Sequence, residues 1–226
     1  RVLADGYDPD VFVDGPLVSA MRDGSLLYIE EINRIPEETL NVLITVMSER
    51  ELHVPRLGRV VAEPGFRLVA AMNPFDAIGT ARISSAVYDR VCRLSVDYQS
   101  ALDEETIVAR LVEPTPDLDW LAQVVEVVRL TRSHPDVRIG SSVRGAIDIA
   151  AVAATLAPLR HSSATSFDVG LDSAIVALSG RLRLREGLSR NAESIVVELW
   201  QRVFGEHAAE SSGKVSAPTG ATRQTR

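Results

Sequence analysis

Two adjacent carboxylates, Glu30 and Glu31, directly follow a hydrophobic run, Ser25–Ile29. A short apolar run bounded by polar residues predicts a buried strand. Carboxylates at the C-terminal end of a parallel strand lie at the mouth of the sheet, where open α/β folds bind ligands. One carboxylate can hold the water shell of Mg²⁺ there while its neighbour orients an attacking water. The plainer interpretation is a strand end followed by the acidic first turn of a helix.

A second hydrophobic run, Phe66–Met72, ends at Asn73. An amide at this position could donate a hydrogen bond to a terminal phosphate or position the same attacking water. Alternatively, Asn73 and Pro74 simply form a turn, as this pair commonly does. The carboxylate pair at the end of the preceding strand favours the functional interpretation.

Two arginines could contact phosphates. Arg90 follows Asp89 at the end of a predicted helix, and its guanidinium could stabilise transition-state charge on a nucleotide of a neighbouring subunit. A surface Asp–Arg ion pair explains the same two residues more plainly. Arg144 lies near the start of an Ala-rich helix, where a helix N-terminus and a cation can together form an anion site. An ordinary surface arginine is the alternative.

Composition excludes several classes of function. The 226 residues carry a formal charge of −7, which argues against a general nucleic-acid or anionic-membrane surface. The single cysteine, Cys92, permits no internal disulfide and indicates a reducing, cytoplasmic location. The longest nearly uncharged stretch, residues 145–159, is too short to cross a bilayer. No G-x-S-x-G motif occurs, and the four histidines show no ligand spacing, so acyl-transfer and metal-centre enzymes are disfavoured.

The elements around these residues predict an α/β core over residues 1–111. Helices are expected at Gly15–Asp23, after Pro36 and at Ile83–Arg90, and a third short strand at Arg93–Val96. The alternation of strands and helices favours a parallel sheet. Residues 51–61 predict a projecting hairpin, and residues 1–14 predict a loop or hairpin insert.

A second, all-helical region follows a Pro-rich linker at residues 112–117. Helical patterns predict a domain over residues 118–205, and the Ser-, Gly- and Thr-rich residues 206–226 predict a disordered tail. The helices expected in this domain are Leu118–Ser133, Ser142–Leu159, Leu171–Leu184 and Ser189–Val203.

With these features in this order, the sequence resembles the MoxR family of AAA+ ATPases, and more distantly the ATPase subunit of magnesium chelatase. The resemblance spans most of residues 15–150, and its most specific part is EEINRIPEETLN. It rests on GPLVSAM, LLYIEEINRIPEETLNVLITVMSER, FRLVAAMNP with the following GT, YDRV, and TRSHPDVRIGSSVRGAI.

The resemblance implies a role for each candidate residue. Glu30 stands at the Walker B position associated with Mg²⁺, and Glu31 stands at the catalytic glutamate. Asn73 matches sensor 1, Arg90 matches the arginine finger, and Arg144 matches sensor 2 in the helical lid. ATP and Mg²⁺ are the implied cofactors.

The resemblance also implies an architecture and partners. The fold would be an incomplete parallel-sheet P-loop NTPase (AAA+) core followed by an all-α lid. Residues 1–14 would be the remainder of the helix-2 insert, and residues 51–61 the hairpin before sensor 1. The protein would form a hexameric ring that remodels or activates a partner in a chaperone-like way, such as in metal-centre maturation, and family partners often carry a von Willebrand A domain.

Two departures from the family pattern matter. Glu30 replaces the usual aspartate, which moves the carboxylate outward by one methylene. No G-x-x-x-x-G-K-[ST] motif occurs, and the only lysine is Lys214. We expect that the sequence begins inside the ATPase core, that this chain alone is inactive, and that apolar sheet residues are exposed (Leu26, Leu27, Val69 and Ala70).

Two other functions remain open. The first is a degenerate AAA+ interaction subunit that does not hydrolyse ATP, and the missing phosphate-binding motif is what suggests it. The second is a DNA-associated AAA+ relative, against which the acidic charge balance argues.

Overall fold

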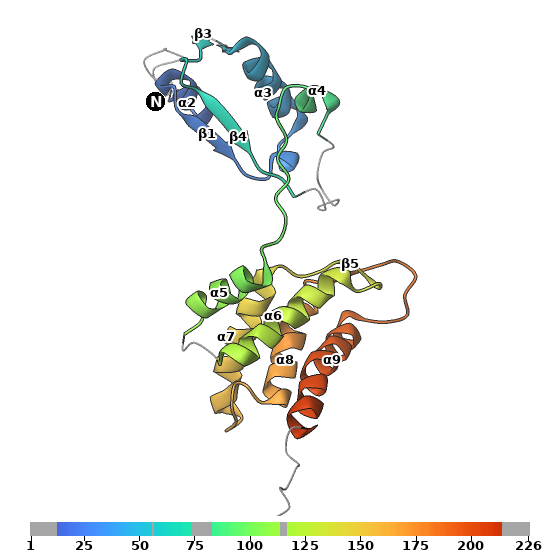
Figure 1. Cartoon of the computed structure of the whole chain (residues 1–226). Coiled ribbons are helices and arrows are strands. Elements are labelled where there is room, and N and C mark those ends of the chain that lie inside the picture. Colours follow the sequence, from blue (N-terminus) through green and yellow to red (C-terminus); the bar gives the residue numbers. More distant parts are fainter. Residues whose placement is uncertain (1–12, 56, 74–82, 114–116, 214–226) are drawn as a thin grey trace, which may run out of the picture. The chain divides into compact units, whose positions relative to one another are not determined.

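A computed structural model describes residues 13–55, 57–73, 83–113 and 117–213, with the side chains of residues 206–213 excepted. The chain divides into two compact units, Arg1–Ser95 and Val96–Arg226. Each unit has its own hydrophobic core and is described separately (Figure 1). Residues 1–12, on which most of the expected insert remnant falls, and the GT at 79–80 lie outside the described residues.

The first unit contains a parallel pair of strands, β1 (Leu26–Ile29) and β4 (Arg67–Ala70). The register pairs Leu26 with Arg67 and Ile29 with Ala70, so both strands end at the same edge. Both strands lie within the runs predicted to be strands, which confirms the predicted parallel α/β arrangement. An antiparallel hairpin of β2 (Glu51–Val54) and β3 (Gly58–Val61) lies where it was predicted.

The described residues of the first unit also form three helices and a short 3-10 turn. They are α2 (Pro16–Asp23), η2 (Ile32–Arg34), α3 (Glu37–Glu49) and α4 (Ser85–Tyr88). Helix α2 begins with Pro16, which the first helical turn tolerates, and ends at Gly24 in the left-handed conformation. Helix α3 carries Glu37 and Glu38 in its first turn, where they oppose the positive end of the helix dipole.

Among the residues that the structure describes, only one face of the β1–β4 pair is covered. Leu27 and Leu68 pack against the core formed by α2, α3 and the hairpin. On the other face Leu26, Tyr28 and Val69 are 60%, 54% and 48% exposed. Ala70 is also exposed, but Leu27 is half-buried, which corrects the expectation that it would be exposed. Alternation along a strand sends Leu27 to the face opposite Leu26.

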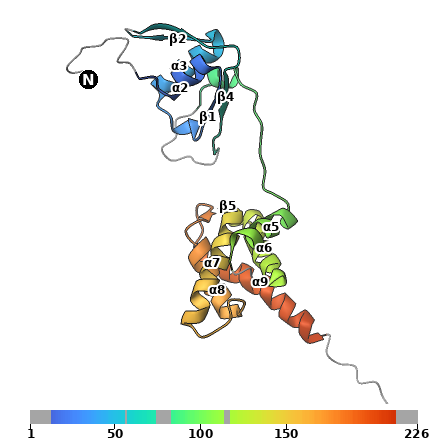
Figure 2. The same ribbon diagram turned by 90° about the vertical axis from the view of Figure 1, so that its left-hand side faces the viewer.

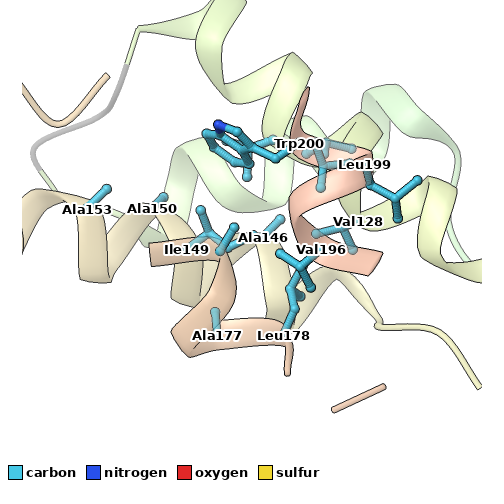
Figure 3. Close-up of a cluster of buried hydrophobic side chains, with 14 of the residues drawn as sticks. Val128, Ala146, Ile149, Ala150, Ala153, Ala177, Leu178, Val196, Leu199 and Trp200 are labelled. Atoms are coloured by element: carbon cyan, nitrogen blue, oxygen red, sulfur yellow. The ribbon is translucent and has the colours of Figure 1, made fainter. Parts of the chain in front are cut away.

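The second unit is mainly helical (Figure 2). Its elements are α5 (Ala101–Leu111), α6 (Leu118–Ser133), β5 (Val137–Ile139), α7 (Val143–Leu159), α8 (Phe167–Leu178), β6 (Arg183–Leu184) and α9 (Ala192–Gly213). Its core joins Ile149 and Ala146 of α7 with Leu178 of α8 and with Val196 and Trp200 of α9 (Figure 3). The small residues of α7 let α8 approach closely, because the side chain of an alanine occupies little space between two helices.

The boundary between the units differs from the expected one. The first unit ends at Ser95, so α5 belongs to the second unit and not to the core predicted over residues 1–111. The reason is burial, since Val108 of α5 is fully buried in the core of the helical unit and Glu104 is buried beside it. The composition change at 112–117 falls between the end of α5 at Leu111 and the start of α6 at Leu118.

Three predicted elements were wrong. Residues 93–96 form no strand; Leu94 and Val96 are 86% and 87% exposed, since an apolar run becomes a strand only when another strand pairs with it. The helix predicted at residues 171–184 ends at Leu178, and the alternating residues beyond it form β6, which pairs with β5. The tail predicted from residue 206 is helical to Gly213, because a helix propagates easily once its first turns are formed.

Candidate functional site

The carboxylate pair and Asn73 lie at one edge of the sheet. The backbone N–H of Ala71 donates to the carbonyl of Ile29 at 2.8 Å, and the N–H of Ile32 donates to the carbonyl of Ala71 at 3.1 Å. These bonds continue the pairing of β1 and β4 beyond their last paired residues, Ile29 and Ala70. The segments that carry Glu30, Glu31 and Asn73 are therefore held side by side.

Glu31 has an unusual backbone conformation. Its φ of 52° and ψ of 46° place it in the left-handed region, where residues other than glycine incur strain of about 1 kcal/mol or more. Its carboxylate lies 3.3 Å from Nε of Arg34, but both side chains are about half exposed, so this ion pair is weak. The carboxylate of Glu31 thus remains accessible to a water or a ligand from solvent.

Glu30 supplies a second exposed carboxylate at this edge. Within the described residues, no group of three histidine, cysteine, aspartate or glutamate side chains could enclose a metal ion. Mg²⁺ does not require such a cage, because it keeps several waters and binds through one or two carboxylates and the phosphates of its substrate. The oxygen donors of Glu30 and Glu31 fit that kind of coordination.

Asn33 is a residue of this site to which the sequence interpretation assigned no role. Its side chain is only 5% exposed, and its Nδ2 donates to the backbone carbonyl of Asn73 at 3.3 Å. Its Oδ1 is buried and accepts no hydrogen bond from the residues described. The available signal was a polar residue inside the most specific stretch of the resemblance, next to apolar Ile32. Asn33 ties the turn after Glu31 to the end of β4.

Arg90 lies away from this edge. Its Nε donates to Oγ of Ser48 at 2.5 Å, and its Nη1 donates to the carbonyl of Ala86 at 2.8 Å. Ser48 is near the end of α3, whereas Glu31 precedes the start of that helix. At 1.5 Å per residue, α3 separates the two positions by roughly 16 Å along its axis. Within the first unit of a single chain, Arg90 therefore does not lie near Glu31.

Arg144 belongs to the second unit. It is the second residue of α7, is exposed, and follows the N-cap residue Ser142. Among the residues described, no hydrogen bond or ion pair involves its guanidinium. A cation next to the positive end of a helix dipole leaves a site that attracts anions.

Comparisons with known proteins found one family model and several relatives that match this chain. Residues 3–91 match the AAA domain (dynein-related subfamily). An uncharacterized protein of Staphylococcus epidermidis is 31% identical over 172 residues, which are 70% of this chain and 61% of that protein. An uncharacterized protein of Staphylococcus aureus is 36% identical over 137 residues, which are 54% of this chain and 52% of that protein. The chain thus spans about half to three fifths of the length of these relatives.

A solved structure is more distantly similar. The crystal structure of a candidate ATPase from Cytophaga hutchinsonii has 17% sequence identity and a TM-score of 0.34, covering 78% of this chain and 64% of that one. No helix in the described residues is long and apolar enough to span a membrane. The matched range of the AAA domain (dynein-related subfamily) includes β1, the two carboxylates and Asn73.

Proposed function

We propose that this chain is part of a MoxR-type AAA+ protein that hydrolyses ATP in an oligomeric ring to remodel or activate a partner protein. The observation that supports this most is the shared edge of β1 and β4, where the segments that carry Glu30, Glu31 and Asn73 are held side by side. The AAA domain match over the same residues supports the proposal that the site binds a nucleotide.

In the proposed reaction, water attacks the γ-phosphorus of ATP and the bond to the β-γ bridging oxygen breaks, giving ADP and phosphate. Glu31 orients the water and accepts its proton, which its exposed carboxylate is free to do. Asn73 positions the same water or a γ-phosphate oxygen. Glu30 holds the magnesium ion, mostly through its bound waters. When bound, that ion neutralises charge on the phosphates.

The two arginines would act on phosphate charge. Arg90 is held at the end of α3, away from Glu31, so we assign it to the nucleotide of a neighbouring subunit. Arg144 would contact the phosphates from the lid. The backbone loop and lysine that usually grip the β- and γ-phosphates have no counterpart in residues 1–213, so we expect this chain alone to bind ATP weakly.

Replacing Glu31 by glutamine in the intact protein tests the reaction. The amide cannot accept the proton, so we expect ATP turnover to fall by about 10²–10⁴-fold while ATP binding remains. Glu38→Gln is the matched control, because Glu38 is an exposed glutamate in the first turn of α3 outside the sheet edge. Unchanged turnover in Glu31→Gln would exclude the proposed role of Glu31.

A non-hydrolysing interaction subunit is the second candidate, because the sequence lacks a phosphate-binding motif. It predicts that ring assembly and partner binding need neither ATP nor Glu31. Sedimentation of the intact protein with and without Mg-ATP distinguishes the two, since the ATPase predicts a ring that nucleotide strengthens. Co-purification would then show whether the partner carries a von Willebrand A domain, as the resemblance implies.

A further inference from the structure

A buried carboxylate joins two helices of the second unit. Glu104 of α5 is only 1% exposed, and each of its oxygens meets a different arginine of α6. Nη1 of Arg129 donates to Oε2 at 3.0 Å, and Nη2 of Arg132 donates to Oε1 at 2.7 Å. An unpaired charge at this depth would be strongly destabilising, so at least one of these arginines is needed for neutralisation.

Arg132 does more than neutralise Glu104. Its Nε donates to the backbone carbonyl of Ser141 at 2.8 Å, and its guanidinium lies 3.9 Å from the centre of the Tyr98 ring. The neighbouring Thr131 accepts a hydrogen bond from the N–H of Ser141 at 2.9 Å. A Cβ on Gly140 would lie 2.7 Å from the backbone of Arg132, so the loop before α7 lies directly on the end of α6.

This loop leads directly to Arg144. Ser141 precedes the N-cap residue Ser142, and Arg144 follows two residues later. A Cβ on Gly145 would lie 2.3 Å from Oγ of Ser141, so the first turn of α7 packs tightly on Ser141. A shift of Ser141 must therefore shift the turn of α7 that carries Arg144.

We propose that Arg132 is a positioning residue for Arg144. This inference rests on the proposed role of Arg144 in binding nucleotide phosphate. Arg132 is suited to the task because its planar guanidinium contacts the carboxylate, the loop carbonyl and the ring at once. Through its contact with the Tyr98 ring, Arg132 also holds the first residues of the second unit. The position of Arg144 is therefore fixed relative to those residues.

Arg129 provides the matched control. It pairs with the same carboxylate, but its remaining hydrogen bond goes to the carbonyl of Gln99 and not to Ser141. Arg129→Met and Arg132→Met each leave Glu104 with one arginine. Both variants are therefore expected to be less stable, and only Arg132→Met releases Ser141.

The test uses the intact protein and measures the KM for Mg-ATP together with thermal stability. We expect Arg132→Met to raise the KM about tenfold and Arg129→Met to change it less than about twofold. Arg132→Lys should recover much of the stability, because a lysine can still pair with Glu104, but it should keep the raised KM. This variant keeps the test informative if Arg132→Met does not fold.

The double variants separate the inference from the proposed function. Arg144→Ala should raise the KM by itself, and adding Arg132→Lys to it should cause no further rise. A further rise, or a KM that follows stability across all variants, would mean that Arg132 is only structural. If Arg144→Ala leaves the KM unchanged, Arg144 does not bind nucleotide phosphate, and the inference about Arg132 is then wrong as well. A normal KM in Arg132→Lys with a raised KM in Arg144→Ala would overturn the inference alone.

Discussion

Gly170 in helix α8 is required by the side chain that faces it. A Cβ at this position would lie 2.4 Å from Cζ2 and 2.8 Å from Cη2 of Trp200. Trp200 is fully buried, stacks on Phe204 with ring centres 4.0 Å apart, and meets Phe167 edge-on at 6.5 Å. The indole is rigid and enclosed, so it cannot turn away from an added methyl group as a flexible side chain could.

Two effects of opposite sign act in Gly170→Ala. Alanine is favoured over glycine inside a helix by about 1 kcal/mol. Over-packing a well-filled core costs about 1–3 kcal/mol, and a contact of 2.4 Å is more than 1 Å shorter than an ordinary carbon–carbon contact. The contact is so short that the clash should outweigh the helix preference, and we expect the second unit to lose up to about 2 kcal/mol of stability.

Tryptophan fluorescence during urea unfolding measures this loss in the whole chain. The chain has two tryptophans, Trp120 and Trp200, and both are buried in the second unit, so the signal reports the unfolding of that unit. Gly205→Ala is the control, because Gly205 lies in α9 with no atom within 4 Å of its added Cβ. This control should gain up to about 1 kcal/mol.

The difference between the two glycine variants isolates the clash. We expect Gly170→Ala to unfold at lower urea than the unmodified chain and Gly205→Ala at the same or higher urea, with unchanged slopes. If Gly170→Ala were as stable as Gly205→Ala, the tight contact between α8 and the indole would be wrong.

Three further predictions concern other parts of the chain. Asn33→Ala should lower ATP turnover of the intact protein more than its ATP affinity, because the change removes the hydrogen bond from the Asn33 side chain to the carbonyl of Asn73; steady-state kinetics checks this, and an equal effect on both would contradict it. The hydrogen bond from Arg190 lowers the pKa of Glu198 from 4.5, so this contact adds stability above pH 4.5 that is lost as the pH falls through the lowered pKa. Urea unfolding at pH 7 and pH 3 should therefore show that Arg190→Gln loses less stability on acidification than the unmodified chain. An equal loss of stability in both would refute the stabilising role of the contact between Arg190 and Glu198. Val69→Thr should reduce self-association of the chain in light scattering, since Val69 lies on the exposed sheet face, and undiminished scattering would show that this face is not responsible.

Much of the local structure could be predicted because it depends on local pattern. The apolar runs before Glu30 and Asn73 have the length and composition of buried strands, and the structure confirms both. Their common edge also follows from sequence, since parallel strands in one sheet end on the same side. The helix predicted to begin after Pro36 is confirmed as α3, which starts at Glu37.

Contacts between distant residues could not be predicted in this way. Nothing near Glu104 in the sequence indicates that this glutamate is buried, because the two arginines that neutralise it lie 25 and 28 residues away. The run at residues 93–96 has the apolar pattern of a strand but finds no strand to pair with in the described chain. Asn33 looks like an ordinary turn residue until the end of β4 is brought against it.

The sequence by itself determined the α/β character of the first unit, the helical character of the second, and the identity of the carboxylates at the sheet edge. Period and residue type encode these features within a few neighbouring positions. Only the tertiary structure decided that Asn33 holds Asn73, that α5 belongs to the helical unit, and that Arg132 links the buried Glu104 to the loop before Arg144. Burial and ion pairing depend on which distant segments meet, and that is settled only when the whole chain packs.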